Sequence, residues 1–351
     1  MTSHSLATAL LQASADRLSP IEGLWRLFEW LLVYVYGAGM NLLSELLGVR
    51  MLGYPYMQRA YLAGACIAVI GPLVGTFLVH REMSMLADTL AHTAFAGVAV
   101  GLFLNAALSL SLSPLLTAMI VAIGTALLVE LLIDYAGAYS DTSLAIVLTT
   151  GFALGSVLIT ATDGGIAVGI DAYLFGSLST VSKENVGLLV AMSFLIGTLV
   201  TAAYRPLLYV TVDATAARAA RINVRLYKRL MVVLTALVVV SAMQIMGVIL
   251  VAAMLVVPVA TAGFVAQSFK QSILLAILAA EFAVLSGVTI AYVYGLAAGG
   301  SIVLSAAAVY ATVLVVAKAD TRWLIRSLPR RTGQSIEHTQ QGLEADGGER
   351  E

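Results

Sequence analysis

Cysteine and charged residues are the two residue classes that this chain of 351 residues nearly lacks. Cys66 is its single cysteine, so the sequence excludes a disulfide framework and a cysteine-rich metal site. Any metal ion must therefore be held by oxygen and nitrogen donors. Charged residues make up 11% of the chain, against roughly 25% in soluble proteins. This composition indicates a membrane protein.

Sequence motifs for several enzyme classes are missing as well. The chain contains no G-x-x-x-x-G-K-[ST] phosphate loop, so it cannot supply an ATPase of that kind. It also contains neither H-E-x-x-H nor G-x-S-x-G, the motifs of zinc peptidases and serine hydrolases. We therefore expect no enzyme, no permanently bound cofactor and no nucleic-acid partner.

Hydrophobic residues, in contrast, make up 60% of the chain and occur in long continuous runs. Several runs exceed the roughly 18–20 residues that a helix needs to cross a bilayer, whereas a β-barrel would show short alternating strands. The sequence therefore predicts an all-α polytopic membrane helical bundle with about nine transmembrane helices. The expected spans are residues 58–79, 83–105, 114–133, 142–162, 186–204, 230–246, 247–266, 271–292 and 301–317.

The N-terminal part is less clearly patterned. Residues 24–47 mix apolar residues with tryptophan, tyrosine, arginine and glutamate, which suits the membrane interface as well as its interior. This segment is either an interfacial helix or a tenth span. We expect a mobile tail over residues 1–20, the interfacial or additional helix within 21–56, a transmembrane domain over 57–317 and a cytoplasmic C-terminal tail over 318–351.

Positive charge is concentrated in two segments. Six of the 19 lysines and arginines lie in residues 205–229, and five more lie in residues 318–331. The positive-inside rule places both segments in the cytoplasm, with the start of the first clear span outside. We therefore expect a multi-pass protein of the plasma membrane, surrounded by lipids.

An acid and an imidazole interrupt the second expected span. Asp88 and His92 are four residues apart, so they lie on one face of a helix. They are expected about 10 Å and about 16 Å from the cytoplasmic end of the span. A carboxylate and a neutral imidazole are suitable ligands for Zn²⁺, Mn²⁺ or Fe²⁺. The alternative is an Asp–His hydrogen bond that only joins two helices.

Two ligands hold a divalent ion weakly, because such ions usually take four to six. The remaining ligands must come from other spans, from water or from a second copy of the chain. Glu281 and Glu130 lie at comparable depths in two other expected spans, so they are candidates for additional metal ligands or for acids that line the ion path. The alternative for each is a carboxyl group that is protonated or paired with a hydroxyl group.

The basic loop over residues 205–229 contains a short predicted helix. Asp213 is placed to cap its N-terminus, a run of alanine and arginine including Arg218 and Arg221 follows, and Asn223 could adopt the left-handed conformation that ends it. Such a helix either docks on a partner or faces solvent and lipid headgroups.

At these residues the chain resembles the permease subunits of the ABC transporters that take up zinc, manganese or iron. Four blocks carry the resemblance, at residues 81–92 (R-E-M-S-M-L-A-D-T-L-A-H), 140–146 (S-D-T-S-L-A-I), 172–178 (A-Y-L-F-G-S-L) and 247–262. The resemblance covers roughly residues 57–317 and implies the type II ABC importer fold. It also implies a second copy of the chain, two cytoplasmic ATP-binding subunits and an extracellular metal-binding lipoprotein. In that family the acid and histidine that match Asp88 and His92 are associated with metal passage.

The same resemblance identifies the loop with Asp213, Arg218, Arg221 and Asn223 as the coupling helix that docks on the ATPase. Members of the family commonly have glycine where Arg221 stands. A left-handed conformation there would cost on the order of 1 kcal/mol without glycine, so we expect the helix to end at Asn223 instead. Glu281 has no counterpart in the family pattern.

The expected function is that of the permease subunit of an ATP-driven importer of Zn²⁺, Mn²⁺ or Fe²⁺. One alternative is a secondary carrier in which Asp88, His92 and Glu281 form a proton or ion relay. A scaffold or channel subunit without a substrate site would tolerate the loss of Asp88 and His92. A permease for iron–siderophores or cobalamin would have similar spans but would not need the acid–histidine pair.

Overall fold

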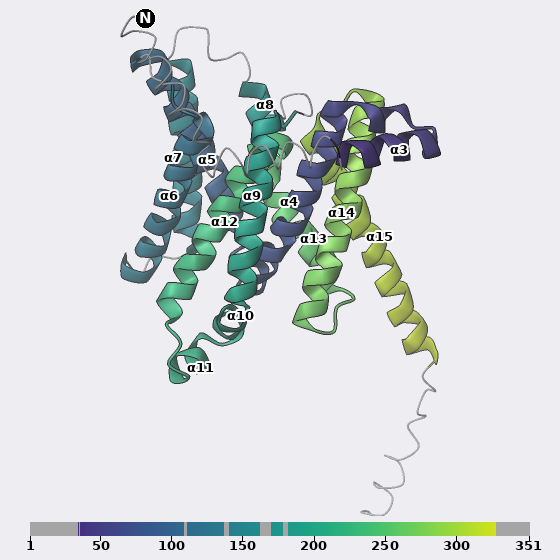
Figure 1. Ribbon diagram of the computed structural model, residues 1–351. Coiled ribbons are helices and arrows are strands. Elements are labelled where there is room, and N and C mark those ends of the chain that lie inside the picture. Colours follow the sequence, from purple (N-terminus) through teal and green to yellow (C-terminus); the bar gives the residue numbers. More distant parts are fainter. Residues whose placement is uncertain are drawn as a thin grey trace, which may run out of the picture. The chain divides into compact units, whose positions relative to one another are not determined.

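The structure is a computed structural model that describes residues 34, 36–108, 111–136, 140–161, 170–177 and 182–327. The chain divides into two compact units, Met1–Tyr310 and Ala311–Glu351. The first unit contains all the side chains discussed below. Its described part is helical apart from short connections, as the hydrophobic runs of the sequence predict (Figure 1).

The described residues contain nine long helices, and each corresponds to one of the expected spans. They are joined by shorter helices that lie at the ends of the long ones. The long helices are α4 (Pro55–His80), α5 (Ser84–Leu108), α6 (Pro114–Ala136), α7 (Ser140–Thr160), α9 (Lys183–Ala202), α12 (Val224–Met246), α13 (Val248–Gly263), α14 (Phe269–Tyr294) and α15 (Ala298–Ser327). The shorter ones are α3 (Gly37–Leu47), the 3₁₀ helix η2 (Arg50–Gly53), α8 (Ile170–Phe175), α10 (Tyr204–Val212) and α11 (Ala214–Ala219).

The helix ends follow local sequence signals. The side chain of Ser182 accepts a hydrogen bond from the backbone N–H of Asn185 at the start of α9, and Ser268 does the same for Gln271 at the start of α14. Gly295 ends α14 in the left-handed conformation that glycine adopts without steric cost.

Helix α13 lies inside the bundle, in contact with α4, α5, α12 and α14. Gly75 of α4 lets the two helices approach closely, because a Cβ atom at Gly75 would overlap the carbonyl oxygen of Leu255 in α13. The core is therefore built around a helix that is surrounded by other helices. The candidate site on α5 lies next to this core, since α5 also packs against α6 and α7.

Eight helices in the described part of the chain are long and apolar enough to cross a membrane. The ninth expected span corresponds to α13, a shorter apolar helix of 16 residues. Its length of about 24 Å falls short of a hydrocarbon core of about 30 Å. Because α13 packs against α4, α5, α12 and α14, neighbouring helices can cover backbone groups at its ends.

The question of a tenth span concerns residues 24–47. Helix α3, the described part, has 11 residues and is about 16 Å long, too short to cross a bilayer. Residues 24–33 lie outside the described part of the chain. The choice between an interfacial helix and an additional span stays a prediction.

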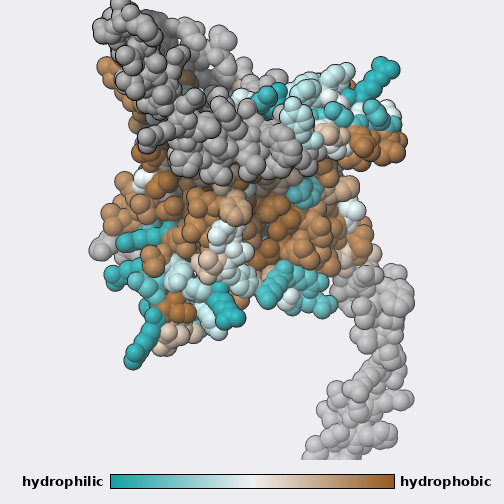
Figure 2. Space-filling model, viewed as in Figure 1, coloured by the Kyte–Doolittle hydropathy of each residue, from teal (hydrophilic) through white to brown (hydrophobic). Residues whose placement is uncertain are grey.

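Polar residues gather at the end of the bundle formed by α10, α11 and the start of α12. The visible face is brown, and therefore apolar, across its middle and teal along this edge (Figure 2). Arg205, Arg218, Arg221, Arg225, Lys228 and Arg229 belong to this end. The positive-inside rule predicts that this end faces the cytoplasm.

Candidate functional site

Asp88 and His92 lie on successive turns of α5, as the spacing predicts. The Nε2 atom of His92 is 3.6 Å from the Oδ1 atom of Asp88. Metal–ligand bonds to these atoms are about 2.0–2.2 Å long, so one divalent ion between the two atoms could contact both. The Asp88 side chain is 41% exposed on the surface of the single chain, whereas the His92 side chain is 16% exposed.

The place of the pair along α5 follows from the start of the helix. Counted from Ser84, where α5 begins, Asp88 is about 6 Å and His92 about 12 Å along the helix axis. The helix starts one residue later than the expected span, after the left-handed residue Glu82. The depth of the pair in the membrane stays a prediction.

The ring of His92 packs against an aromatic pair. The Phe152 ring of α7 lies edge-on to the imidazole, with ring centroids 5.3 Å apart and an angle of 87° between the planes. Phe152 in turn stacks on Phe95 of α5 at 5.6 Å. Neither phenylalanine was identified from the sequence. The spacing Gly151-x-x-x-Gly155 around Phe152 is the available signal, because small residues four apart let two membrane helices approach closely.

Glu130 lies in the last two turns of α6 and forms an ion pair with Arg229. Its Oε2 atom is 3.5 Å from Nε of Arg229 in α12, and its side chain is 9% exposed. Together with Arg81 and Lys228 it lines a cavity of about 100 Å³. The pKa of the Arg81 guanidinium lies below its ordinary value because the group is buried, and the negative charge of Glu130 offsets part of this effect. The role of Glu130 as a metal ligand or path-lining acid stays a prediction.

Glu281 is a half-buried residue of α14, a helix that packs against α4 and α13. Within the described part of one chain, no three His, Cys, Asp or Glu side chains are close enough together to hold a metal ion. A single chain therefore brings Asp88 and His92 together but does not add Glu281 or Glu130 to them. The assignment of Glu281 to the ion path stays a prediction.

The basic loop contains the predicted short helix, α11. Asp213 caps its N-terminus by accepting hydrogen bonds from the backbone N–H groups of Thr215 at 2.7 Å and Ala216 at 3.0 Å. These bonds from Ala216 and Thr215 hold the pKa of Asp213 below its ordinary value. The N-cap prediction is confirmed.

The end of α11 differs from the prediction. Arg221 adopts a left-handed conformation with φ of 61°, and the N–H of Ile222 donates to the carbonyl of Ala217 while that of Arg221 donates to Arg218. This pattern is a Schellman motif. Asn223 is not left-handed: its φ is −74°, and it caps the start of α12 by accepting from the N–H of Leu226. The expectation that the helix ends at Asn223 was wrong. The paired hydrogen bonds and the packing of Ile222 against the buried Ala217 place the left-handed residue two positions earlier, at Arg221.

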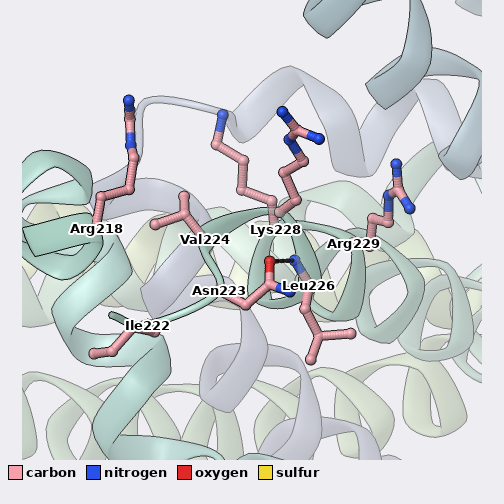
Figure 3. Close-up of a pocket in the computed structure, with 8 residues that line it drawn as sticks. Arg218, Ile222, Asn223, Val224, Leu226, Lys228 and Arg229 are labelled. Carbon is pink, nitrogen blue, oxygen red and sulfur yellow. Dashed lines mark hydrogen bonds between the residues drawn. The ribbon is translucent and has the colours of Figure 1, made fainter. Parts of the chain in front are cut away.

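A cavity of about 770 Å³ opens beside this turn. The side chains of Arg218, Lys228 and Arg229 extend to the same side of the backbone, whereas Ile222 and Leu226 point the other way (Figure 3). The full lining is Arg218, Ile222, Asn223, Val224, Arg225, Leu226, Lys228 and Arg229, with no acidic residue among them. The cavity therefore attracts negatively charged groups.

Comparisons with known proteins place the chain in a family. Residues 53–317 match the ABC 3 transport family. The manganese transport system membrane protein MntC of Halalkalibacterium halodurans is 30% identical over 268 residues, covering 75% of this chain and 87% of the relative. The manganese import system permease protein ScaB of Streptococcus gordonii is also 30% identical over 268 residues, covering 75% and 92%.

Solved structures with this fold are known as well. PsaBC from Streptococcus pneumoniae, solved in complex with a Fab, has a chain that aligns with a TM-score of 0.68 at 28% identity, covering 77% of this chain and 95% of that one. A metal-chelate type ABC transporter in an inward-facing conformation aligns with a TM-score of 0.59 at 18% identity, which indicates a common fold.

Proposed function

Because this chain belongs to the ABC 3 transport family, we propose that it is the membrane-spanning permease subunit of an ATP-driven importer of divalent metal ions, with Mn²⁺ as its principal substrate. The observation that carries the proposal is the pair of donor atoms on α5, Asp88 Oδ1 and His92 Nε2, 3.6 Å apart. The relatives named above as manganese transporters favour Mn²⁺ over Zn²⁺ and Fe²⁺. A carboxylate and an imidazole suit all three ions, so the donor pair alone does not select among them.

The exposure of the donor pair supports a path at the surface of the single chain. Asp88 is 41% exposed although it lies within a candidate span. An aspartate in the middle of a span costs about 2.5–3.5 kcal/mol on insertion scales, and less near the ends. We therefore place the exposed face of α5 against a water-filled path or a second copy of the chain, rather than against lipid.

A second copy would also complete the ligand set. A twofold axis beside α5 would bring two carboxylates and two imidazoles to one ion, which supplies four of the four to six ligands that such ions usually take. Each chain alone supplies two. A site that is complete only when two copies face each other can release its ion when they separate, as alternating access requires.

The energy source must be a partner, because the sequence has no phosphate loop of its own. We assign docking of two cytoplasmic ATP-binding subunits to α11 and the cavity beside it. Helix α11 is capped at both ends and Arg218 lies exposed in its last turn, so the loop presents a defined basic surface to an acidic partner. An extracellular metal-binding lipoprotein would deliver the ion at the opposite end.

Uptake of radioactive Mn²⁺, Zn²⁺ and Fe²⁺ tests this proposal. Cells that lack their own importer would carry the permease with its ATPase and its binding protein, and wild type would be compared with His92→Ala and Asp88→Asn at matched membrane levels. We expect wild type to accumulate Mn²⁺ and both variants to lose uptake. His80→Ala is the matched control, since His80 contacts the carbonyl of Thr76 at the end of α4.

Two outcomes would contradict the proposal. Normal uptake by both variants would make the acid–histidine pair structural. Uptake that persists when the partner ATPase is inactivated, but stops when the proton gradient is collapsed, would favour the secondary carrier.

A further inference from the structure

The orientation of His92 needs an explanation. A histidine that binds a metal is usually held by a hydrogen bond from its second ring nitrogen to a carboxylate, a carbonyl group or water. In this chain the second nitrogen, Nδ1, is buried and has no hydrogen-bond partner among the described residues. The first, Nε2, faces Asp88 at 3.6 Å, beyond the ordinary range of a hydrogen bond. Within the described residues, therefore, no hydrogen bond to Nδ1 fixes the ring.

Aromatic packing fixes the orientation of the His92 ring instead. The edge-on contact between Phe152 and His92 covers one side of the imidazole, and such contacts between aromatic rings contribute about 0.5–1.5 kcal/mol. Phe152 is itself backed by Phe95, which is 3% exposed and so has no freedom to move away. The three rings form a row that begins in the core and ends at the donor pair.

Close contacts between α5 and α7 hold the three rings in place. A Cβ atom at Gly151 would lie 2.7 Å from Cγ2 of Thr93, and one at Gly155 would lie 2.8 Å from the ring of Phe95. Helices α5 and α7 thus touch on both sides of Phe152 through residues that have no side chain. In addition, the buried hydroxyl of Thr89, next to Asp88, shares its proton between the carbonyl of Met85 in α5 at 3.0 Å and that of Leu144 in α7 at 3.2 Å. Neither helix can rotate or slide without breaking these contacts.

We infer that Phe152 is a positioning residue for ion transfer: its ring holds the His92 imidazole with Nε2 directed toward Asp88, so that both donors can bind one divalent ion. This inference rests on the proposed function. Phe152 is 40% exposed on α7, so part of its ring contacts His92 and Phe95 while the rest faces outward. In many metal sites a hydrogen bond to the second ring nitrogen orients the histidine. Here the ring of Phe152 orients His92.

The test compares Phe152→Leu, which removes the ring but keeps an apolar side chain, with Phe152→Tyr, which keeps the ring. The complete transporter would be reconstituted into liposomes with its ATPase and binding protein, and metal transported per ATP hydrolysed would be measured. We expect Phe152→Leu to lower this ratio about tenfold while ATP hydrolysis stays within about twofold of wild type. Phe152→Tyr should retain at least about half of the wild-type ratio, since the ring remains.

Exposed phenylalanines elsewhere provide matched controls. Phe194 on α9 is 78% exposed and Phe282 on α14 is 62% exposed, so leucine at either position removes a surface ring without reaching His92. Both controls should transport like wild type. If Phe152→Leu also does so, or if it lowers ATP hydrolysis in proportion to transport, the ring has no positioning role. Equal losses in Phe152→Tyr and Phe152→Leu would overturn the inference too.

The same experiment separates the inference from the proposed function. If wild type moves none of the three metals, the proposed function fails. If wild type transports metal and His92→Ala abolishes transport while Phe152→Leu does not, the proposed function stands and only the role of Phe152 is lost.

Discussion

Replacement of Arg221 by glycine should stabilise the turn between α11 and α12. Arg221 has a φ of 61°, a conformation in which every side chain except glycine crowds the backbone. The conformation is held by two hydrogen bonds, from Ile222 to Ala217 and from Arg221 to Arg218, both of 3.0 Å. The Arg221 side chain itself is exposed, so its removal takes no packing away from the turn.

The size of the effect follows from the cost of the left-handed conformation. That cost is roughly 1 kcal/mol for a residue other than glycine. A stabilisation of 1 kcal/mol lowers the population of the opened turn about fivefold, so the amide hydrogen of Ile222 should exchange with solvent about five times more slowly in Arg221→Gly. The backbone hydrogen bonds of the turn are otherwise unchanged.

Hydrogen exchange measured by mass spectrometry on peptides that cover α11 would detect this change in the purified permease. Arg221→Ala is the matched control, because alanine removes the positive charge and keeps the crowded conformation. We expect slower exchange in Arg221→Gly than in Arg221→Ala, after correction for the intrinsic exchange rates of each sequence. Equal protection in the two variants would refute the argument from backbone crowding.

Three further outcomes follow from the contacts described above. Gly75→Ala should lower the free energy of unfolding by about 1–3 kcal/mol, seen as a lower melting temperature in detergent, because its Cβ atom would overlap the carbonyl oxygen of Leu255. Asp213→Ala should weaken binding of the ATPase in a pull-down, because α11 loses its N-cap. In wild type the stabilisation by the cap is fully present above the ordinary carboxyl pKa and is lost as the pH falls through the lowered pKa of Asp213. Acid should therefore weaken binding in wild type as the substitution does. Glu130→Gln should lower the free energy of unfolding by about 1–3 kcal/mol in chemical denaturation. We expect a loss near the lower end of this range, because the Arg229 side chain is 51% exposed and water can hydrate it once the ion pair is removed.

Hydrophobic run length predicted the transmembrane helices well, because a helix that crosses a membrane must satisfy its own backbone and needs a fixed number of apolar residues. Their ends were less predictable. The span expected to begin at residue 230 begins at Val224, since Asn223 caps the helix and the basic side chains of its first two turns extend away from it. Charge marked the edge of the membrane at this point but not the edge of the helix.

The candidate site, too, could be predicted from the sequence only in part. Helical periodicity was sufficient to place Asp88 and His92 on one face, because that relation depends on α5 alone. The contact with Phe152 depends on how α5 meets α7, which no pattern within one helix contains. The left-handed conformation of Arg221 was missed for a different reason: the hydrogen bonds that compensate for its cost involve residues on both sides of the turn.

The close fit between α5 and α7 has a consequence for motion. Two helices that touch through Gly151 and Gly155 and share the Thr89–Leu144 hydrogen bond have one well-packed arrangement, so they are expected to move as a single rigid body. Helix α6 fits against α5 in the same way, because Cβ atoms at Gly97 and Gly101 would overlap Ala118 and Thr117 of α6. Relative motion within the bundle must then occur at other contacts, such as those that α5 makes with α12 and α13. A displacement of α12 would reach α6 through the Arg229–Glu130 ion pair, and from there it would turn the whole α5–α7 unit together with its donor atoms.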